Sequence, residues 1–202
     1  PGEENADLMI SLLDSTIKFI ICRHEQGAAF MADVYGRLTG KPGVCLGTLG
    51  PGATNLTTGV ANAHFDRSPL VAITGQGSTM RLHKESHQNM NVVDMFRPIT
   101  KWATTIRQPE NIPEVIHKAF KYASEEKPGA CHIELPEDIA KLDHDLSPIR
   151  SKGYKLRRPA PDYKAIKQAL TILSSAKKPL ILAGNGCIRK RASKQLKIFT
   201  DK

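Results

Sequence analysis

The sequence predicts an α/β fold with a mostly parallel sheet and helices on both faces of that sheet. Apolar runs of strand length alternate along the chain with longer segments of helical periodicity, an order typical of parallel α/β domains. Three of these runs are followed by Gly or Glu, and ligands bind at the carboxyl ends of the strands in such sheets. The alternation therefore predicts both the architecture and the edge where a site is expected.

Strands buried on both faces are expected wherever apolar residues follow one another with little alternation. The buried strands are predicted at 17–22 (IKFIIC), 43–50, 69–74 and 130–135. The stretch 99–106 alternates, so it is predicted to be an edge strand. Helices are predicted at 26–38, 53–64 and 110–125, the last because its apolar residues share one face.

The chain is expected to hold most of one domain and the start of another. Residues 1–140 form the first predicted domain, which lacks its first elements because the opening PGEENADLM resembles the middle of a fold. Residues 141–161, with three prolines and scattered charge, are predicted to be a linker. A helix at 162–175 and a strand at 178–186 then open a second α/β unit, 162–202. That unit is too short to bury a domain-sized core, so it is expected to be incomplete.

The composition is that of an ordinary globular protein. The 202 residues are 40% hydrophobic and 24% charged, with neither an apolar run of membrane-spanning length nor a signal peptide. Three of the four widely spaced cysteines, Cys22, Cys45 and Cys131, sit in apolar runs. They are expected to be core residues rather than zinc ligands or disulfide partners, which favours a reducing, cytoplasmic setting.

The net positive charge comes entirely from the end of the chain. Residues 1–150 carry 15 basic and 18 acidic side chains, whereas residues 151–202 carry 14 basic and 2 acidic ones. Few aromatic residues accompany that charge, namely Tyr154, Tyr163 and Phe199. A solvated helical surface is the preferred interpretation, and a nucleic-acid-binding module is the alternative.

Glu25 directly follows the first predicted strand. A partly buried carboxylate at a strand end can exchange protons with a ligand. The alternative is an exposed acid at the start of a helix, stabilised by the helix dipole. The local sequence leaves both interpretations open.

The turn Gly50-Pro51-Gly52 follows the second strand and precedes a helix. Glycines let a ligand approach the backbone closely, and a helix start offers free N–H groups. The lysine and the spacing of nucleotide-binding loops are absent, so a tight turn capped by Thr54 or Asn55 is the alternative. His83 and His87 lie four residues apart, but no acidic third ligand has a suitable spacing, so a solvated loop is preferred over a metal site.

Taken together, residues 23–76 resemble the pyrimidine-binding domain of thiamine-diphosphate-dependent enzymes, and the acetolactate synthases in particular. The resemblance rests on motifs that follow one another in the expected order across nearly the whole chain. They are RHEQGA, GKPGV, GPGATNL, DRSPL and AITGQ, followed by FRPITKWA (96–103) and KPGACHIELPEDIA (127–140).

The resemblance implies thiamine diphosphate as the cofactor and assigns roles to several residues. Glu25 would bond a ring nitrogen of the aminopyrimidine and favour the imino tautomer, which takes the proton from the thiazolium C2. Pro51, Gly52 and Asn55 would line the pyrimidine, and Gln88 would face the substrate. Gly2, Glu3 and Phe30 would lie near the substrate entrance.

The implied reaction is the decarboxylation of pyruvate and its condensation with a second 2-keto acid to acetolactate, a step of branched-chain amino acid biosynthesis. Other thiamine-diphosphate enzymes, such as sulfoacetaldehyde acetyltransferase or pyruvate oxidase, are the alternatives. The family binds the diphosphate and Mg²⁺ through a Gly-Asp-Gly motif in a C-terminal domain, and this motif is absent from the 202 residues. The chain alone is therefore expected to be inactive and to contribute no metal ligand.

The resemblance also implies partners. Active sites of this family lie between two chains, so a homodimer or a tetramer is expected, with 2-keto acids as substrates and neither nucleic acid nor a membrane as partner. FAD occurs in part of the family. The segment SHQNM (86–90) is more similar to members without it, so FAD is possible but not favoured.

Overall fold

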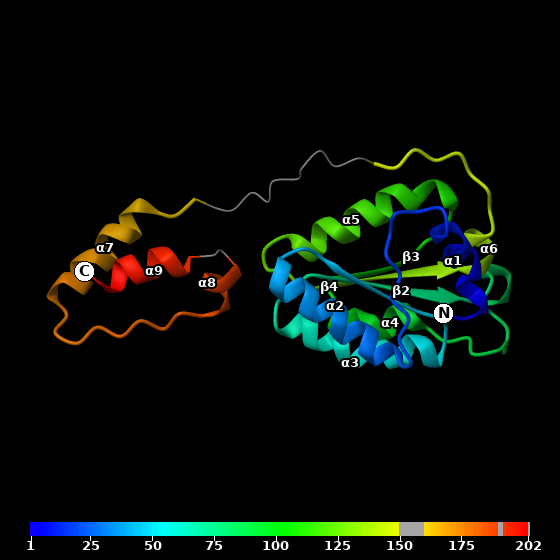
Figure 1. Ribbon diagram of the computed structural model, residues 1–202, viewed down its shortest axis with the longest axis horizontal. Helices are drawn as coiled ribbons and strands as arrows, with labels where there is room; N and C mark the ends of the chain where they lie inside the picture. The colour runs from blue at the N-terminus through cyan, green and yellow to red at the C-terminus, as the bar shows by residue number, and fades with distance from the viewer. Residues whose placement is uncertain (150–159, 190–191, 202) are drawn as a thin grey trace. The chain divides into compact units, whose positions relative to one another are not determined.

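The computed structural model describes residues 1–149, 160–189 and 192–201. The chain forms two compact units, which divide between Tyr154 and Lys155 (Figure 1). The first unit contains a sheet with helices, and the second contains helices.

The first unit is built on a four-stranded sheet in which all neighbouring strands are parallel. The strand order is β1-β2-β4-β3, so β3 lies at one edge, as the sequence predicts for residues 99–106. The strands are β1 (Gly43–Gly47), β2 (Leu70–Gln76), β3 (Trp102–Thr105) and β4 (Ala130–Pro136). The predicted parallel α/β architecture is confirmed.

Helices cover both faces of this sheet, as predicted (Figure 1). One face is covered by α2 (Glu25–Thr39), α3 (Pro51–Phe65) and α4 (Val92–Phe96), which share a core that includes Leu56, Leu70 and Phe96. The other face is covered by α1 (Ala6–Leu12), α5 (Ile112–Ser124) and α6 (Glu137–Ala140), around a core that includes Val71 and Ile133. Short 3-10 helices connect these elements: η1 (Glu3–Asn5), η2 (Thr79–Arg81), η3 (Arg97–Ile99) and η4 (Pro109–Asn111).

Small residues set the close approach of α2 to its neighbours. A Cβ atom at Gly43 would lie 2.1 Å from the Ala32 carbonyl oxygen, and one at Gly59 would lie 2.5 Å from the Ala29 Cβ. Because side chains larger than glycine overlap there, the spacing between α2, α3 and β1 depends on these positions. The packing holds the beginnings of α2 and α3 side by side.

The predicted first strand, 17–22, is wrong. This segment forms neither a strand nor a helix, and its apolar side chains are exposed, with Ile21 75% accessible. Among the described residues, β2 is the strand that pairs with β1, and no strand lies on the other side of β1. An apolar run without a hydrogen-bonding partner cannot form a ladder, which accounts for the difference.

The second unit contains α7 (Tyr163–Ser175), α8 (Asn185–Arg189) and α9 (Ser193–Thr200). The predicted helix 162–175 is confirmed by α7, but the predicted strand 178–186 is wrong. Residues 178–184 have no regular structure, and Leu180 and Leu182 are 92% and 95% exposed. No strand is found in the described part of this unit, so nothing there pairs with the apolar run. Part of the predicted linker, including Tyr154, lies outside the described residues.

The cysteines are free thiols, and two of them are core residues as predicted. Cys45 and Cys131 are buried, and burial raises the pKa of each thiol to about 12. Both are therefore poor nucleophiles. Cys22 was expected in the core with them but is only half-buried, because its predicted strand does not form.

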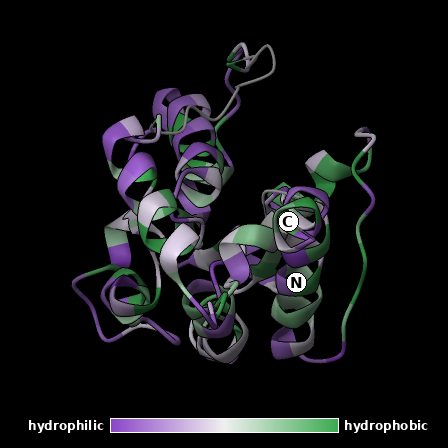
Figure 2. Ribbon diagram, turned by 90° about the vertical axis from the view of Figure 1, so that its left-hand side faces the viewer, coloured by the Kyte–Doolittle hydropathy of each residue, from purple (hydrophilic) through white to green (hydrophobic). Residues whose placement is uncertain are grey.

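Hydrophilic and hydrophobic residues alternate along the helical ribbons (Figure 2). This pattern is expected of helices that bury one side and expose the other. Within the part of the chain that the structure describes, none of the helices is long and apolar enough to cross a membrane.

Candidate functional site

Predicted site residues from separate parts of the sequence meet at the carboxyl ends of β1 and β2. The contributing segments are the N-terminal turn, the start of α2, the turn between β1 and α3, and the loop that follows β2.

Glu25 is the first residue of α2 and is half-buried. The preceding His24 caps this helix, since its Nδ1 accepts a hydrogen bond of 3.1 Å from the Gln26 amide. The Glu25 Oε2 atom accepts a hydrogen bond of 3.0 Å from Asn55 Nδ2, in the first turns of α3. Glu25 is thus a helix-start acid and also a carboxylate fixed by a neighbouring helix. Its Oε1 atom accepts no hydrogen bond from the described residues, so it can accept an N–H group from a ligand.

The turn between β1 and α3 presents bare backbone beside this carboxylate. Gly50 is buried with a φ of +52°, a left-handed conformation that side chains disfavour. Pro51 begins α3, where its fixed φ suits the first helical position. A Cβ atom at Gly52 would lie 2.7 Å from Thr48 Cγ2 and 3.5 Å from Glu25 Oε1. The Gly52 backbone therefore lies directly beside the Glu25 carboxylate and the Thr48 side chain, with no side chain of its own between them.

Gln88 comes from the loop after β2 and lies against the same turn. A Cβ atom at Gly50 would be 2.7 Å from Gln88 Cβ and 3.3 Å from Gln88 Oε1. Gln88 itself is exposed and has a φ of +52°. The structure thus brings Gln88 to the turn that carries Pro51 and Gly52.

The N-terminal turn reaches the site through residues that the sequence analysis missed. Thr48 Oγ1 donates a hydrogen bond of 2.8 Å to Glu4 Oε2, and the buried Asn5 donates one of 3.2 Å to the Gly47 carbonyl. Gly2 packs so closely on Thr48 that a Cβ atom would lie 2.4 Å from Thr48 Oγ1. The signal that was available is the position of Thr48 at the end of a strand, three residues before Pro51.

Two predicted residues are less closely connected. Glu3 lies in η1 but is exposed, and the adjacent Glu4 makes the contact to Thr48 instead. Phe30 lies five residues after Glu25 in α2, a spacing that places the two side chains on different sides of the helix. His83 and His87 are both exposed, and the described residues contain no group of three His, Cys, Asp or Glu side chains arranged to hold a metal.

A buried polar network lies beneath the site. Gln76, at the end of β2, donates through Nε2 to Glu134 Oε2 at 2.9 Å and to the Met90 carbonyl at 3.0 Å. The other Glu134 oxygen accepts a hydrogen bond of 2.7 Å from Thr105 Oγ1 in β3. Burial raises the pKa of Glu134, although the bonds from Thr105 and Gln76 oppose the shift.

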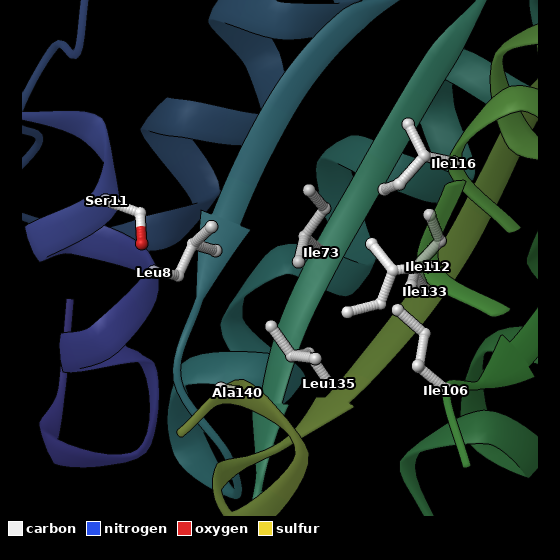
Figure 3. A pocket seen from close by; sticks show the side chains of 9 residues that line it. All are labelled: Leu8, Ser11, Ile73, Ile106, Ile112, Ile116, Ile133, Leu135 and Ala140. Atoms are coloured by element: carbon white, nitrogen blue, oxygen red, sulfur yellow. The ribbon is translucent and has the colours of Figure 1, made fainter. Parts of the chain in front are cut away.

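A separate apolar cavity lies on the opposite face of the sheet. Its volume is about 190 Å³, and its walls come from α1, α5, α6 and the central strands (Figure 3). Eight of the nine side chains that line it are apolar, and Ser11 is the exception. The cavity shares no residue with the site at Glu25, so it is not the pocket for a ligand held there.

Comparison with known proteins agrees with this geometry. Residues 1–95 match the family model of the thiamine pyrophosphate enzyme N-terminal TPP binding domain. A probable acetolactate synthase large subunit of Methanococcus aeolicus is 42% identical over 97% of this chain. The acetolactate synthase large subunit of Buchnera aphidicola subsp. Schizaphis graminum is 42% identical over 92% of it, and acetolactate synthase 2, chloroplastic, of Nicotiana tabacum is 38% identical over all of it.

The chain covers 34%, 33% and 31% of these three relatives, respectively. It therefore spans about a third of the length of the curated relatives it matches. The matched family model ends at residue 95 and includes Glu25, the Gly50 turn, Asn55 and Gln88. By this match and by its parallel α/β fold, the chain carries a thiamine pyrophosphate enzyme N-terminal TPP binding domain, matched over residues 1–95.

Proposed function

We propose that this chain is the pyrimidine-binding part of an acetolactate synthase, which condenses pyruvate with a second 2-keto acid. The observation that carries the proposal is the Glu25–Asn55 pair beside the bare backbone of Gly52. The similarity to acetolactate synthases from archaea, bacteria and plants supports this choice within the family.

The residues present fit the pyrimidine ring of thiamine diphosphate. Asn55 holds one oxygen of Glu25, so the other oxygen has a fixed direction and can accept an N–H from the ring. Gly52 adds no side chain of its own beside this oxygen, and Pro51 is the first residue of α3. When bound, the cofactor supplies the carbanion chemistry of decarboxylation. Glu25 holds the proton at the ring nitrogen, and Gln88 faces the keto acid across the Gly50 turn.

The other cofactors and the compartment belong to the same proposal. Mg²⁺ would be bound with the diphosphate by residues outside this chain, in keeping with the missing Gly-Asp-Gly motif. The resemblance of the segment 86–90 to flavin-free members favours an enzyme without FAD. The free thiols favour a cytoplasmic location.

Product analysis tests the proposed reaction. The complete protein that contains this chain, supplied with pyruvate, thiamine diphosphate and Mg²⁺, is expected to form acetolactate. Acetyl phosphate from pyruvate and phosphate would instead identify a pyruvate oxidase type, and turnover only with sulfoacetaldehyde would identify the acetyltransferase. The 202-residue chain alone is expected to show no steady turnover, and such turnover would contradict the two-part site.

We also propose that the complete protein is at least a homodimer, with α2 at the interface. The outer side of α2 carries an apolar stripe with helical spacing (i, i+3, i+4, i+7), and Leu38 is 80% exposed. The stripe consists of Met31, Val34, Tyr35 and Leu38. A second copy of the chain would cover this stripe and bring a diphosphate-binding surface towards Glu25.

The substitution Leu38→Glu tests this interface. A charge placed in an apolar contact weakens it by roughly 2–4 kcal/mol, so the dimer dissociation constant should rise at least tenfold. Sedimentation velocity of the complete protein over a dilution series measures this change. Leu13→Glu is the control, because Leu13 is equally exposed but lies outside α2. Unchanged association of Leu38→Glu would rule out α2 as the interface.

A further inference from the structure

The loop that carries Gln88, residues 78–91, is held to the sheet in an unusual conformation. Gln88 has a left-handed backbone and lies against Gly50 in spite of its exposure to solvent. A non-glycine residue keeps such a conformation only where its surroundings enforce it. The contacts that enforce it therefore decide where Gln88 points.

The beginning and middle of the loop are fixed by local bonds. Thr79 donates through its amide and its hydroxyl to the Asp138 carboxylate, and Arg81 pairs with Glu137, so the first turn is attached to α6. Asn89 Nδ2 points at three carbonyl oxygens of the loop, with distances of 3.2–3.4 Å. These oxygens belong to Arg81, Leu82 and Lys84.

The end of the loop is fixed by the buried polar network that contains Gln76 and Glu134. Gln76 Nε2 donates to the Met90 carbonyl, two residues after Gln88. The Gln76 side chain cannot turn over, because its Oε1 accepts the Gly77 amide at 3.0 Å while its Nε2 also donates to Glu134. Glu134 also accepts a hydrogen bond from Thr105 through its other oxygen. Hydrogen bonds thus connect side chains of β3, β4 and β2 to the Met90 carbonyl.

These hydrogen bonds occupy buried positions at which the fold does not require polar side chains. Glu134 is 4% exposed and Gln76 is 1% exposed, and neighbouring positions of β4 carry apolar core residues such as Ile133 and Leu135. A buried carboxylate is seldom more stabilising than an apolar residue of similar volume. What the buried Glu134 does provide is an acceptor that fixes the direction of the Gln76 amide.

We propose that Glu134 and Gln76 are positioning residues that hold the Met90 carbonyl, and through it place Gln88 over the Gly50 turn. The proposal rests on the proposed function for the role of Gln88 toward the keto acid. The tether itself is a property of the chain and can be measured without the reaction.

Glu134→Leu is the test of the tether in the complete protein. Leucine can fill the buried position, but it removes the acceptor that orients Gln76. Hydrogen exchange of the amides in residues 78–91 should become at least about tenfold faster, while exchange in α3 and α5 should stay unchanged. Glu134→Gln should restore slow exchange, because its amide oxygen can still accept from Gln76 while its NH₂ faces Thr105. Unchanged loop exchange in Glu134→Leu, or equally faster exchange everywhere, would overturn the proposal.

Thr105→Val is the matched control, since it removes a bond to Glu134 but leaves the bond between Glu134 and Gln76. It should leave the loop exchange within about twofold of the parent. In activity assays, Glu134→Leu should raise the KM for pyruvate in the direction of Gln88→Ala, and Glu134→Gln should restore it. A normal KM in Glu134→Leu beside a defective Gln88→Ala would overturn the positioning role. A fully active Gln88→Ala would count against the proposed function of Gln88, whereas the tether is judged by the exchange data.

Discussion

Glu25→Gln is expected to slow the loss of the C2 proton of bound thiamine diphosphate by roughly 10²–10⁴-fold, the usual contribution of a positioned acid–base group. The reason lies in the pairing with Asn55, which donates to Oε2. In the variant, the amide oxygen can still accept from Asn55, and the amide NH₂ then faces the ligand. A donor would meet the ring N–H where the parent protein presents an acceptor, so the productive bond is lost.

Exchange of the C2 proton with D₂O, followed by NMR after acid quench of the complete protein, measures this step directly. The fold should persist, because Glu25 is half-buried at the first residue of α2 and its interaction with the helix dipole amounts to about 0.3–1 kcal/mol. Glu114→Gln provides a control of the same chemical change at an exposed position in the first turn of α5. Equal exchange rates in Glu25→Gln and the parent would remove Glu25 from the proton-handling role.

Glu25 illustrates how much of a residue's environment its local sequence can predict. Its position after an apolar run left two interpretations open, and the structure makes it a helix-start acid that also bonds Asn55. That bond joins residues 30 positions apart. No local pattern contains such information, because it depends on how closely α2 approaches α3. The resemblance assigned both residues to the pyrimidine, and the close contact of α2 with α3 at Gly59 accounts for their bond.

The correct and the wrong strands differ in their partners rather than in their composition. The run 69–74 and the run 17–22 are similarly apolar, but β2 has β1 and β4 as neighbours, and no strand among the described residues pairs with 17–22. Periodicity predicts which segments suit a strand, whereas pairing decides which of them form one. The same reason applies to the exposed leucines at 180 and 182.

The tether through Glu134 was also beyond the sequence analysis. Glu134 and Gln76 both lie inside motifs that contributed only to the family resemblance. Their contact needs the register of β2 against β4, in which Gln76 is opposite Pro136 and Thr74 is opposite Glu134. Register across parallel strands is a three-dimensional property, so the structure was required to find it.

A second large effect is expected from His132, which lies at the centre of the sheet. Its ring is fully buried, stacks on Phe96 at a centroid distance of 4.1 Å, and shares a 2.9 Å hydrogen bond between Nε2 and Thr74 Oγ1. No partner for Nδ1 is found among the described residues. Burial lowers the pKa of His132 to about 3, so the ring stays neutral in the folded protein.

The sign of the pH effect follows from this depressed pKa. Below its ordinary value of 6.5, His132 gains a proton in the unfolded chain but not in the folded one, until the pH reaches about 3. Acid therefore favours unfolding across that window, by about 1.4 kcal/mol for each pH unit. Glu134 acts in the opposite direction, because its raised pKa lets the folded protein bind a proton more readily than the unfolded chain does. The lowered pKa of Asp138 adds to the loss of stability in acid.

Urea unfolding of the 202-residue chain at pH 7, 6, 5 and 4 measures the contribution of His132. In His132→Gln the side-chain amide can still bond Thr74 but does not titrate, so the fall in unfolding free energy between pH 6 and pH 4 should be smaller by about 2–3 kcal/mol than in the parent. His83→Gln removes an exposed histidine and should keep the parent's pH dependence. Parallel curves for His132→Gln and the parent would show that another group controls the acid response. A flatter curve for His132→Gln alone would assign the acid response to this buried ring, since both variants replace a histidine with glutamine and differ in its burial.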